Sequence, residues 1–90
     1  MTMANLTSGE WIIVNDVQDL DDNEVRFLPD NILESMLYGT GRWNLNGDEL
    51  EIITANEFIR YTGRFVKGQV SGKGRNQISN EWNFKLIKKE

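Results

Sequence analysis

Residues 42–54 read Arg-Trp-Asn-Leu-Asn-Gly-Asp-Glu-Leu-Glu-Ile-Ile-Thr, and this stretch describes a complete β-hairpin. Polar and apolar side chains alternate from Arg42 to Leu45, which is typical of a strand with one buried face. Asn46-Gly47-Asp48 follows, and Asn-Gly between two such segments is the strongest short signal for a hairpin turn. Leu50 to Thr54 is then the returning strand. The sequence predicts an antiparallel pair at this point.

Similar short segments lie on both sides of this hairpin and predict further strands. Gly63 inside the segment 58–66 indicates a bulge or a corner. Lys67-Gly68 is expected to form a two-residue turn. Residues 73–77 are expected to form a polar loop. Apart from residues 15–23 and the segment between residues 72 and 82 that contains the polar loop, the expected connections are two to five residues long. Because short connections make neighbours in sequence neighbours in space, the strands form a meander. The other expected strands are 11–14, 25–28, 32–38, 58–66, 69–72 and 82–86.

An open sheet of this kind would expose one apolar face and two edges, and closure into a barrel removes both. The sequence therefore predicts an all-β fold, a small antiparallel up-and-down meander barrel of seven or eight strands. Residues 1–90 form a single domain, in which residues 1–8 are expected to be flexible. The residues expected to face inward are Trp11, Ile13, Phe27, Trp43, Leu45, Leu50, Ile52, Ile59, Tyr61, Phe65, Val70, Trp82, Phe84 and Leu86.

Composition excludes several kinds of chemistry. The chain has no cysteine and no histidine, so disulfides, thiol chemistry and the commonest general base and metal ligand are absent. No apolar run is long enough for a membrane span and no secretory signal is visible, so we expect a cytoplasmic protein without a membrane partner. The formal charge is −4, but residues 1–30 carry −6, residues 31–60 carry −3 and residues 61–90 carry +5. Closure would place the acidic first strand beside the basic last strand, where the two attract each other.

A short phrase recurs along the chain. Gly9-Glu10-Trp11 resembles the Gly-x-Trp that opens lipocalin and calycin barrels, and Gly41-Arg42-Trp43 repeats it. The segments 27–31 and 41–50 are similar to small bacterial lipocalin-like domains of uncertain function, and residues 61–84 resemble the same group and the avidin-like barrels. The resemblance covers most of residues 9–87 and rests on structural motifs. It implies a barrel that binds a ligand at its mouth.

Aromatic side chains are the candidates for such a ligand site. If the barrel is hollow, a pocket would be lined by Trp11, Trp43, Tyr61, Trp82 and Phe84. Arg60 would anchor an anion there if it points inward. The alternative is a solid core, because the side chains of an eight-stranded barrel can fill its interior. Strand alternation favours Arg60 on the outer face.

The acidic loop is the candidate for a metal site. Asp19, Asp21 and Asn23 match the first three oxygen positions of a calcium loop, but Glu24 stands where that loop requires glycine. The alternative is a solvated loop of mutually repelling carboxylates. Glu34 and Glu51 would be a catalytic pair only if both faced inward, and alternation places Glu51 outside. We therefore expect no catalytic residue, no enzymatic activity and no cofactor.

Two functions remain open. The first is a non-enzymatic binding module that takes a small apolar or heterocyclic ligand at the barrel mouth. The alternative is an interaction or regulatory module that binds a protein partner, or a second copy of itself, through its outer face, acidic loop or a sheet edge. Apolar residues on the outer face would favour the alternative, and the candidates are Ile12, Val14, Ile53 and Ile87. Nucleic acid is not expected as a partner, because the chain as a whole is acidic.

Overall fold

Eight antiparallel strands form one closed barrel in the computed structural model, which describes residues 6–17, 20–36, 39–54, 58–78 and 80–89. Each strand pairs with the next along the chain, and β8 pairs with β1, which confirms the predicted up-and-down meander. A short 3-10 turn, η1 (Pro29–Asn31), joins β2 to β3. The strands are β1 (Glu10–Asp16), β2 (Asn23–Leu28), β3 (Ile32–Ser35), β4 (Gly39–Asn46), β5 (Glu49–Ile53), β6 (Ile59–Val66), β7 (Gln69–Asn76) and β8 (Glu81–Lys89).

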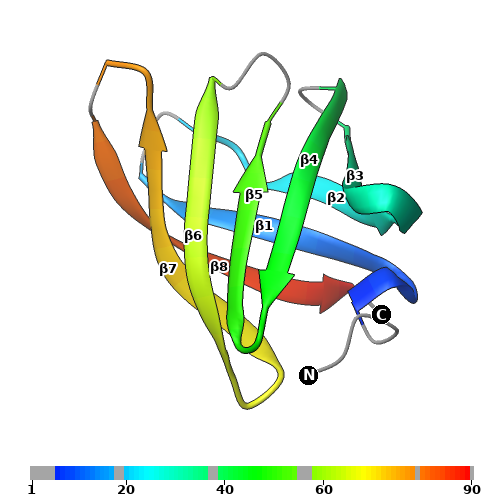
Figure 1. Ribbon diagram of the computed structural model, residues 1–90. Coiled ribbons are helices and arrows are strands. Elements are labelled where there is room, and N and C mark those ends of the chain that lie inside the picture. Colours follow the sequence, from blue (N-terminus) through cyan, green and yellow to red (C-terminus); the bar gives the residue numbers. More distant parts are fainter. Residues whose placement is uncertain (1–5, 18–19, 37–38, 55–57, 79, 90) are drawn as a thin grey trace.

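The wall of the barrel forms two layers whose strands run in different directions. In Figure 1, β4, β5, β6 and β7 run lengthwise at the front, and β1, β2 and β8 cross behind them at a steep angle. Two layers that cross in this way are joined at corners. Strand β8 forms one of them, because it pairs with β7 of the front layer and with β1 of the back layer. Among the described residues, no helix is long and apolar enough to cross a membrane.

The space between the layers is filled by one hydrophobic core. Of the residues predicted to face inward, all are buried except Leu45 and Phe65, which are half-buried and pack against the core. Val25 and Leu33 are also fully buried, although neither is among the residues predicted to face inward. Period-two alternation therefore predicts most of the core.

The N-terminal segment differs from the prediction. Residues 1–8 were expected to be flexible, yet Leu6 is completely buried. The indole Nε1 of Trp11 donates a hydrogen bond of 2.9 Å to the carbonyl of Leu6. A buried indole N–H needs an acceptor, and the chain before β1 supplies it by folding over that end of the barrel. Residues 1–5 lie outside the described part of the chain.

Strand β7 is longer than predicted. It continues through Gly72 and Gly74 to Asn76, where the sequence analysis expected a polar loop from Lys73 to Gln77. The register between β6 and β7 is continuous, so Gly63 marks no bulge; it lies directly opposite Gly72. A Cβ added to Gly72 would lie 2.0 Å from the carbonyl oxygen of Thr62. Glycine is needed here because the backbones of β6 and β7 approach closely at this point.

The two predicted hairpin turns are present. Gly47 and Asp48 connect β4 to β5, and Gly47 has φ of 63°. Lys67 and Gly68 connect β6 to β7 with φ of 54° and 82°. Two consecutive positive φ angles are characteristic of the type I′ turn, whose twist matches that of a hairpin.

Opposite charges meet where the barrel closes. The Nζ of Lys89 on β8 lies 2.7 Å from a carboxylate oxygen of Glu24 on β2 and 3.7 Å from one of Glu10 on β1. The hydrogen bond to Glu24 is the main reason why the pKa of Lys89 is raised. The predicted attraction between the acidic start and the basic end of the chain is therefore confirmed.

We expect Gly72→Ala to destabilise the fold by about 2 kcal/mol or more, because the new methyl group must displace the backbone of β6. Urea unfolding followed by tryptophan fluorescence measures this change. Ser71→Ala, at the exposed neighbouring position, is the matched control and should change the unfolding free energy by less than about 0.5 kcal/mol. Equal stabilities for the two variants would contradict the close approach of β6 and β7.

Candidate functional site

A cluster of hydrogen bonds lies inside the end of the barrel where β1 finishes. The Oδ1 atom of Asn15 accepts hydrogen bonds from the Tyr61 hydroxyl and from the Trp82 indole Nε1, each at 2.9 Å. Its Nδ2 atom donates to the carbonyl of Asp21 at 3.1 Å. Every buried polar side-chain atom among the described residues has a partner. This cluster therefore ties the acidic connection between β1 and β2 to the barrel and leaves no unsatisfied group there for a ligand.

The aromatic side chains form two groups in mutual contact. At one end, the Phe27 ring lies edge-on to Trp11 and Trp43, with centroid distances of 6.3 and 5.7 Å. At the other, Tyr61 contacts Trp82 at 6.3 Å and Phe84 at 4.8 Å. Aromatic rings prefer such edge-on and tilted arrangements, which add to the free energy gained by burial. The rings therefore pack as a core.

The indole N–H group of the third tryptophan, Trp43, also donates hydrogen bonds inside the barrel. The indole Nε1 of Trp43 donates to the carbonyls of Leu28 and Ile32 at 3.0 and 2.9 Å. Together with the bonds of Trp11 and Trp82, all three indole N–H groups thus donate within the barrel. A ligand among these rings would have to break such a bond.

The predicted ligand residues do not lie in one place. Trp11 and Trp43 belong to one end of the barrel, and Tyr61 and Trp82 to the other. Arg60 is on the outer face, where its guanidinium lies 3.5 Å from a carboxylate oxygen of Glu51. Arg60 therefore points outward, as strand alternation favoured, because β6 turns Ile59 and Tyr61 inward, and the conditional role of an inward anion anchor does not apply.

The predicted metal residues are also separated. Asn23 is buried at an inward position of β2, and its side chain exchanges two hydrogen bonds with Ser35, at 2.9 and 3.1 Å. Asp21 is exposed, and Asp19 lies outside the described residues. Asn23 is therefore separated from the exposed Asp21, because its register position points its amide into the barrel. No group of three or more candidate metal ligands occurs in the part of the chain that the structure describes.

The possible catalytic pair faces outward, as the alternation indicated for Glu51. Glu34 lies on the outer face of β3 and its carboxylate is 3.8 Å from the guanidinium of Arg26. Glu51 is the partner of Arg60. Each carboxylate is engaged with a neighbouring arginine on its own part of the wall.

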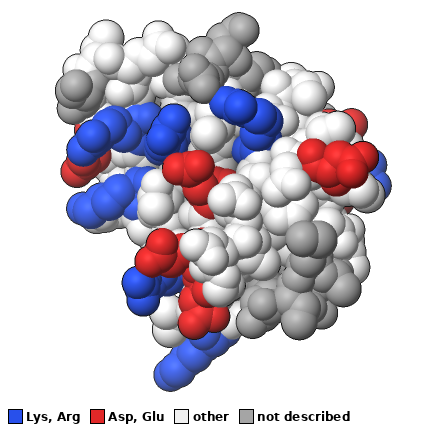
Figure 2. Space-filling view, viewed as in Figure 1, with Lys and Arg blue, Asp and Glu red and all other residues white. Residues whose placement is uncertain are grey.

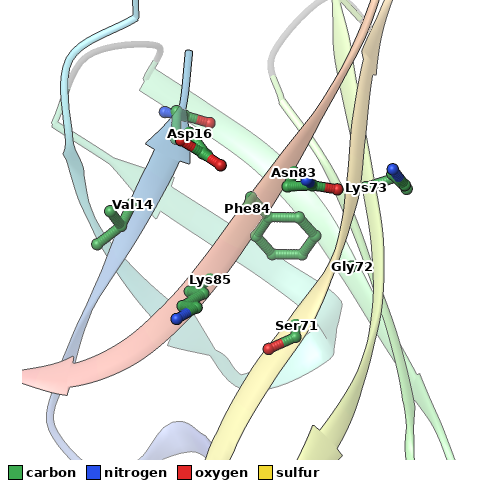
Figure 3. Close-up of a pocket in the computed structure, with 9 residues that line it drawn as sticks. Val14, Asp16, Ser71, Gly72, Lys73, Asn83, Phe84 and Lys85 are labelled. Atoms are coloured by element: carbon green, nitrogen blue, oxygen red, sulfur yellow. The ribbon is translucent and has the colours of Figure 1, made fainter.

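A hollow of about 700 Å³ lies on the outer wall of the barrel, across β1, β8 and β7 (Figure 3). Figure 3 shows the Phe84 ring between β8 and β7 beside Gly72, with Asp16 at the end of β1 and Lys85 further along β8. Most of the lining side chains occupy outward positions in their strands. The lining residues are Val14, Asn15, Asp16, Ser71, Gly72, Lys73, Asn83, Phe84 and Lys85.

The shape of the barrel explains this hollow. A strongly coiled corner strand such as β8 gives the wall a saddle shape, so the outer face is concave along the strand direction. Two of the outward side chains that line it, Ser71 and Asn83, are short and do not fill the concavity. Lys73 and Lys85 form no ion pair with any other described residue, so their ammonium groups are available to a partner.

An apolar stripe borders the hollow. Ile12 on β1 lies opposite Ile87 on β8, and Val14 is the next outward residue of β1. All three are half-buried on the outer face, as is Ile53 on β5. These are the four apolar residues expected from the sequence to favour an outer interaction surface. The period-two alternation that predicted the core also predicts that these four side chains point outward. It does not predict the hollow beside them.

No protein-family model matches this chain, and no curated protein matches it. The fold and the site define the class on their own: a closed, eight-stranded antiparallel barrel, consistent with the calycin architecture, with an aromatic core and a hollow on its outer wall.

We expect Asn15→Ala to lower the unfolding free energy by about 2–5 kcal/mol, because it leaves the buried donors of Tyr61 and Trp82 without an acceptor. Tyr61→Phe removes one donor and keeps the other paired, so it should cost only about 1 kcal/mol. Denaturant unfolding of the two single variants and the double variant measures the coupling. A double variant whose loss equals the sum of the single losses would contradict a shared acceptor.

We expect millimolar calcium to leave the melting temperature unchanged, because Asn23 is turned into the barrel and bonded to Ser35. A thermal melt followed by circular dichroism, with magnesium at equal ionic strength as the control, makes the comparison. A rise that is specific to calcium would restore the acidic loop as a metal site.

Proposed function

We propose that this protein is a non-enzymatic interaction module that binds a protein partner through the outer hollow on β1, β7 and β8. The carrying observation is the position of the open space: the aromatic interior is packed and internally hydrogen-bonded, whereas the outer wall holds a hollow of about 700 Å³. The hollow adjoins the apolar stripe of Ile12, Val14 and Ile87. Apolar residues rimmed by polar ones are typical of interaction sites.

The closed barrel limits the way in which a partner can bind. Every strand pairs on both sides, so addition of a partner strand to a sheet edge is not available. The partner must therefore make contact through side chains that project into the hollow. A convex surface with apolar groups would cover the stripe, and carboxylates at its edge would meet Lys73 and Lys85.

A small apolar or heterocyclic ligand at the barrel mouth has less support. Pockets of that kind enclose most of the ligand surface. Here the aromatic rings contact one another and their N–H groups are used, whereas the hollow lies on the outer wall and spans three strands (Figure 3).

Membership of the lipocalin-like domains is part of this proposal. The Gly9-Glu10-Trp11 phrase leads into β1, and Trp11 packs across one end of the barrel, where the preceding chain covers it. The proposal thus combines a barrel of lipocalin-like design with a binding surface on its exterior.

Site-specific photo-crosslinking in the cells that produce the protein tests the function. With a photoreactive amino acid in place of Ser71, in the hollow, we expect an adduct of defined mass. The same probe in place of Thr40, an exposed position of β4, is the matched control and should give none. Val14→Asp should abolish the adduct, because it puts a charge into the apolar stripe.

Three outcomes are decisive in this experiment. Adducts of one defined protein from position 71 alone support a partner. A product of twice the chain mass would replace the partner by a second copy of the protein. Equal labelling from both positions, or none, would overturn the outer hollow as the binding surface.

A further inference from the structure

Four outward side chains on β6 and β7 form a square. Arg60 lies directly opposite Arg75, and Thr62 lies directly opposite Lys73. Cβ atoms of residues that face each other across two strands are about 4.5–5.5 Å apart. Three cations and a hydroxyl therefore share one small area of the outer wall. Figure 2 shows Lys and Arg side chains gathered over the upper ends of these strands.

The square is hollowed. Its four residues, together with Glu81, line a depression of about 290 Å³. The side chains of Arg60 and Arg75 are 55% and 65% exposed, so their donor groups can reach a ligand from solvent. The depression is separate from the larger hollow on β1, β7 and β8, but Lys73 lines both.

The acids beside the square neutralise it only in part. Glu51 lies 3.5 Å from Arg60, and Glu81 accepts a hydrogen bond from Arg75. That hydrogen bond is the main reason why the pKa of Glu81 is lowered, and the charge of Lys73 adds to the effect. Lys73 itself has no ion-pair partner among the described residues. Like charges directly opposite each other on a sheet are unfavourable, and one positive charge remains unbalanced.

We propose that the square of Arg60, Thr62, Lys73 and Arg75 binds a phosphomonoester group. Each guanidinium carries five N–H donors, so an arginine that already holds a carboxylate keeps donors for a second acceptor. Planar guanidinium groups match phosphate oxygens in pairs, the Lys73 ammonium adds a point charge, and the Thr62 hydroxyl adds one more donor. A phosphomonoester is favoured over a single carboxylate because its three terminal oxygens offer more acceptors to the donors that converge on the depression.

This inference stands on the register of β6 and β7 and does not depend on a protein partner in the larger hollow. The phosphoryl group can belong to a small metabolite or to a phosphorylated side chain, because both present the same dianion. Since Lys73 borders both depressions, groups next to a bound phosphate would reach toward Ser71 and Asn83 in the larger hollow.

Titration of the ¹⁵N-labelled protein with phenyl phosphate, followed by NMR, tests the site. We expect saturable shifts of the amides of residues 60, 62, 73 and 75, and none with phenol at the same concentration. Potassium chloride at equal ionic strength controls for screening. Arg75→Gln should weaken binding about tenfold, the usual effect of losing a charged hydrogen bond. Lys73→Gln is the second variant and should act in the same direction.

Arg64→Gln is the matched control. Arg64 is the next outward arginine on β6 and pairs with Glu49 at 2.6 Å, but it does not line the square. It should leave phenyl phosphate binding unchanged within about twofold. An equal loss in Arg64→Gln and Arg75→Gln would mean general charge attraction and would overturn the site, as would shifts that do not saturate. A phosphoserine tripeptide that binds more tightly than phenyl phosphate would identify a phosphorylated chain as the source; weaker or equal binding would identify a small phosphomonoester.

Discussion

The pairing of β1 with β8 is the contact on which the rest of the structure depends. It runs over seven residues on each strand, from Glu10 opposite Lys89 to Asp16 opposite Asn83. A meander of this length without that pairing would leave two open edges and one exposed apolar face. Closure makes the first and last strands of the chain neighbours, so the whole interior forms only when both ends of the chain are in place.

Closure also sets the composition of the interior. A barrel of eight short strands encloses a volume that side chains can fill, and large rings fill it with few residues. Where the backbones of β6 and β7 approach closely there is no room for a side chain, which is why Gly63 faces Gly72. The recurrent Gly-x-aromatic phrase in the sequence is thus a packing device, since glycine permits the bend and the ring fills the enclosed space.

The sequence predicts the apolar core well and the polar interior poorly. Alternation identifies apolar residues on one face of a strand, and this works wherever the strand is correctly bounded. It misses Asn15 and Asn23, because amides in an acidic stretch resemble a solvated loop. The partners of Asn15 come from distant strands, since Tyr61 lies 46 and Trp82 67 residues further along the chain, and the partner of Asn23 is Ser35 on the neighbouring strand β3. An inward amide can be recognised only when those partners are placed around it.

The candidate site was harder to predict for a different reason. Aromatic residues suggested a pocket inside the barrel, whereas curvature of the wall creates the hollow outside, and curvature leaves no simple trace in sequence. The square of Arg60, Thr62, Lys73 and Arg75 could be predicted in part. The two-residue turn at Lys67-Gly68 fixes the register of β6 and β7, so the pairing of Arg60 with Arg75 follows once β7 is extended past Gly72. Glycine and lysine in that segment resemble a loop, and this concealed the pairing.

The charge of the whole chain says little about what these surfaces attract. The net charge is −4, yet the outer wall of β6 and β7 carries Arg60, Lys73 and Arg75 together. At physiological ionic strength, charges more than about 8 Å apart are largely screened from one another. The acids of β1 and β2 are partly engaged at the seam, where Lys89 holds Glu10 and Glu24. Selection of an anionic ligand therefore depends on the cations at its point of contact, and an acidic protein can present a local site for a dianion.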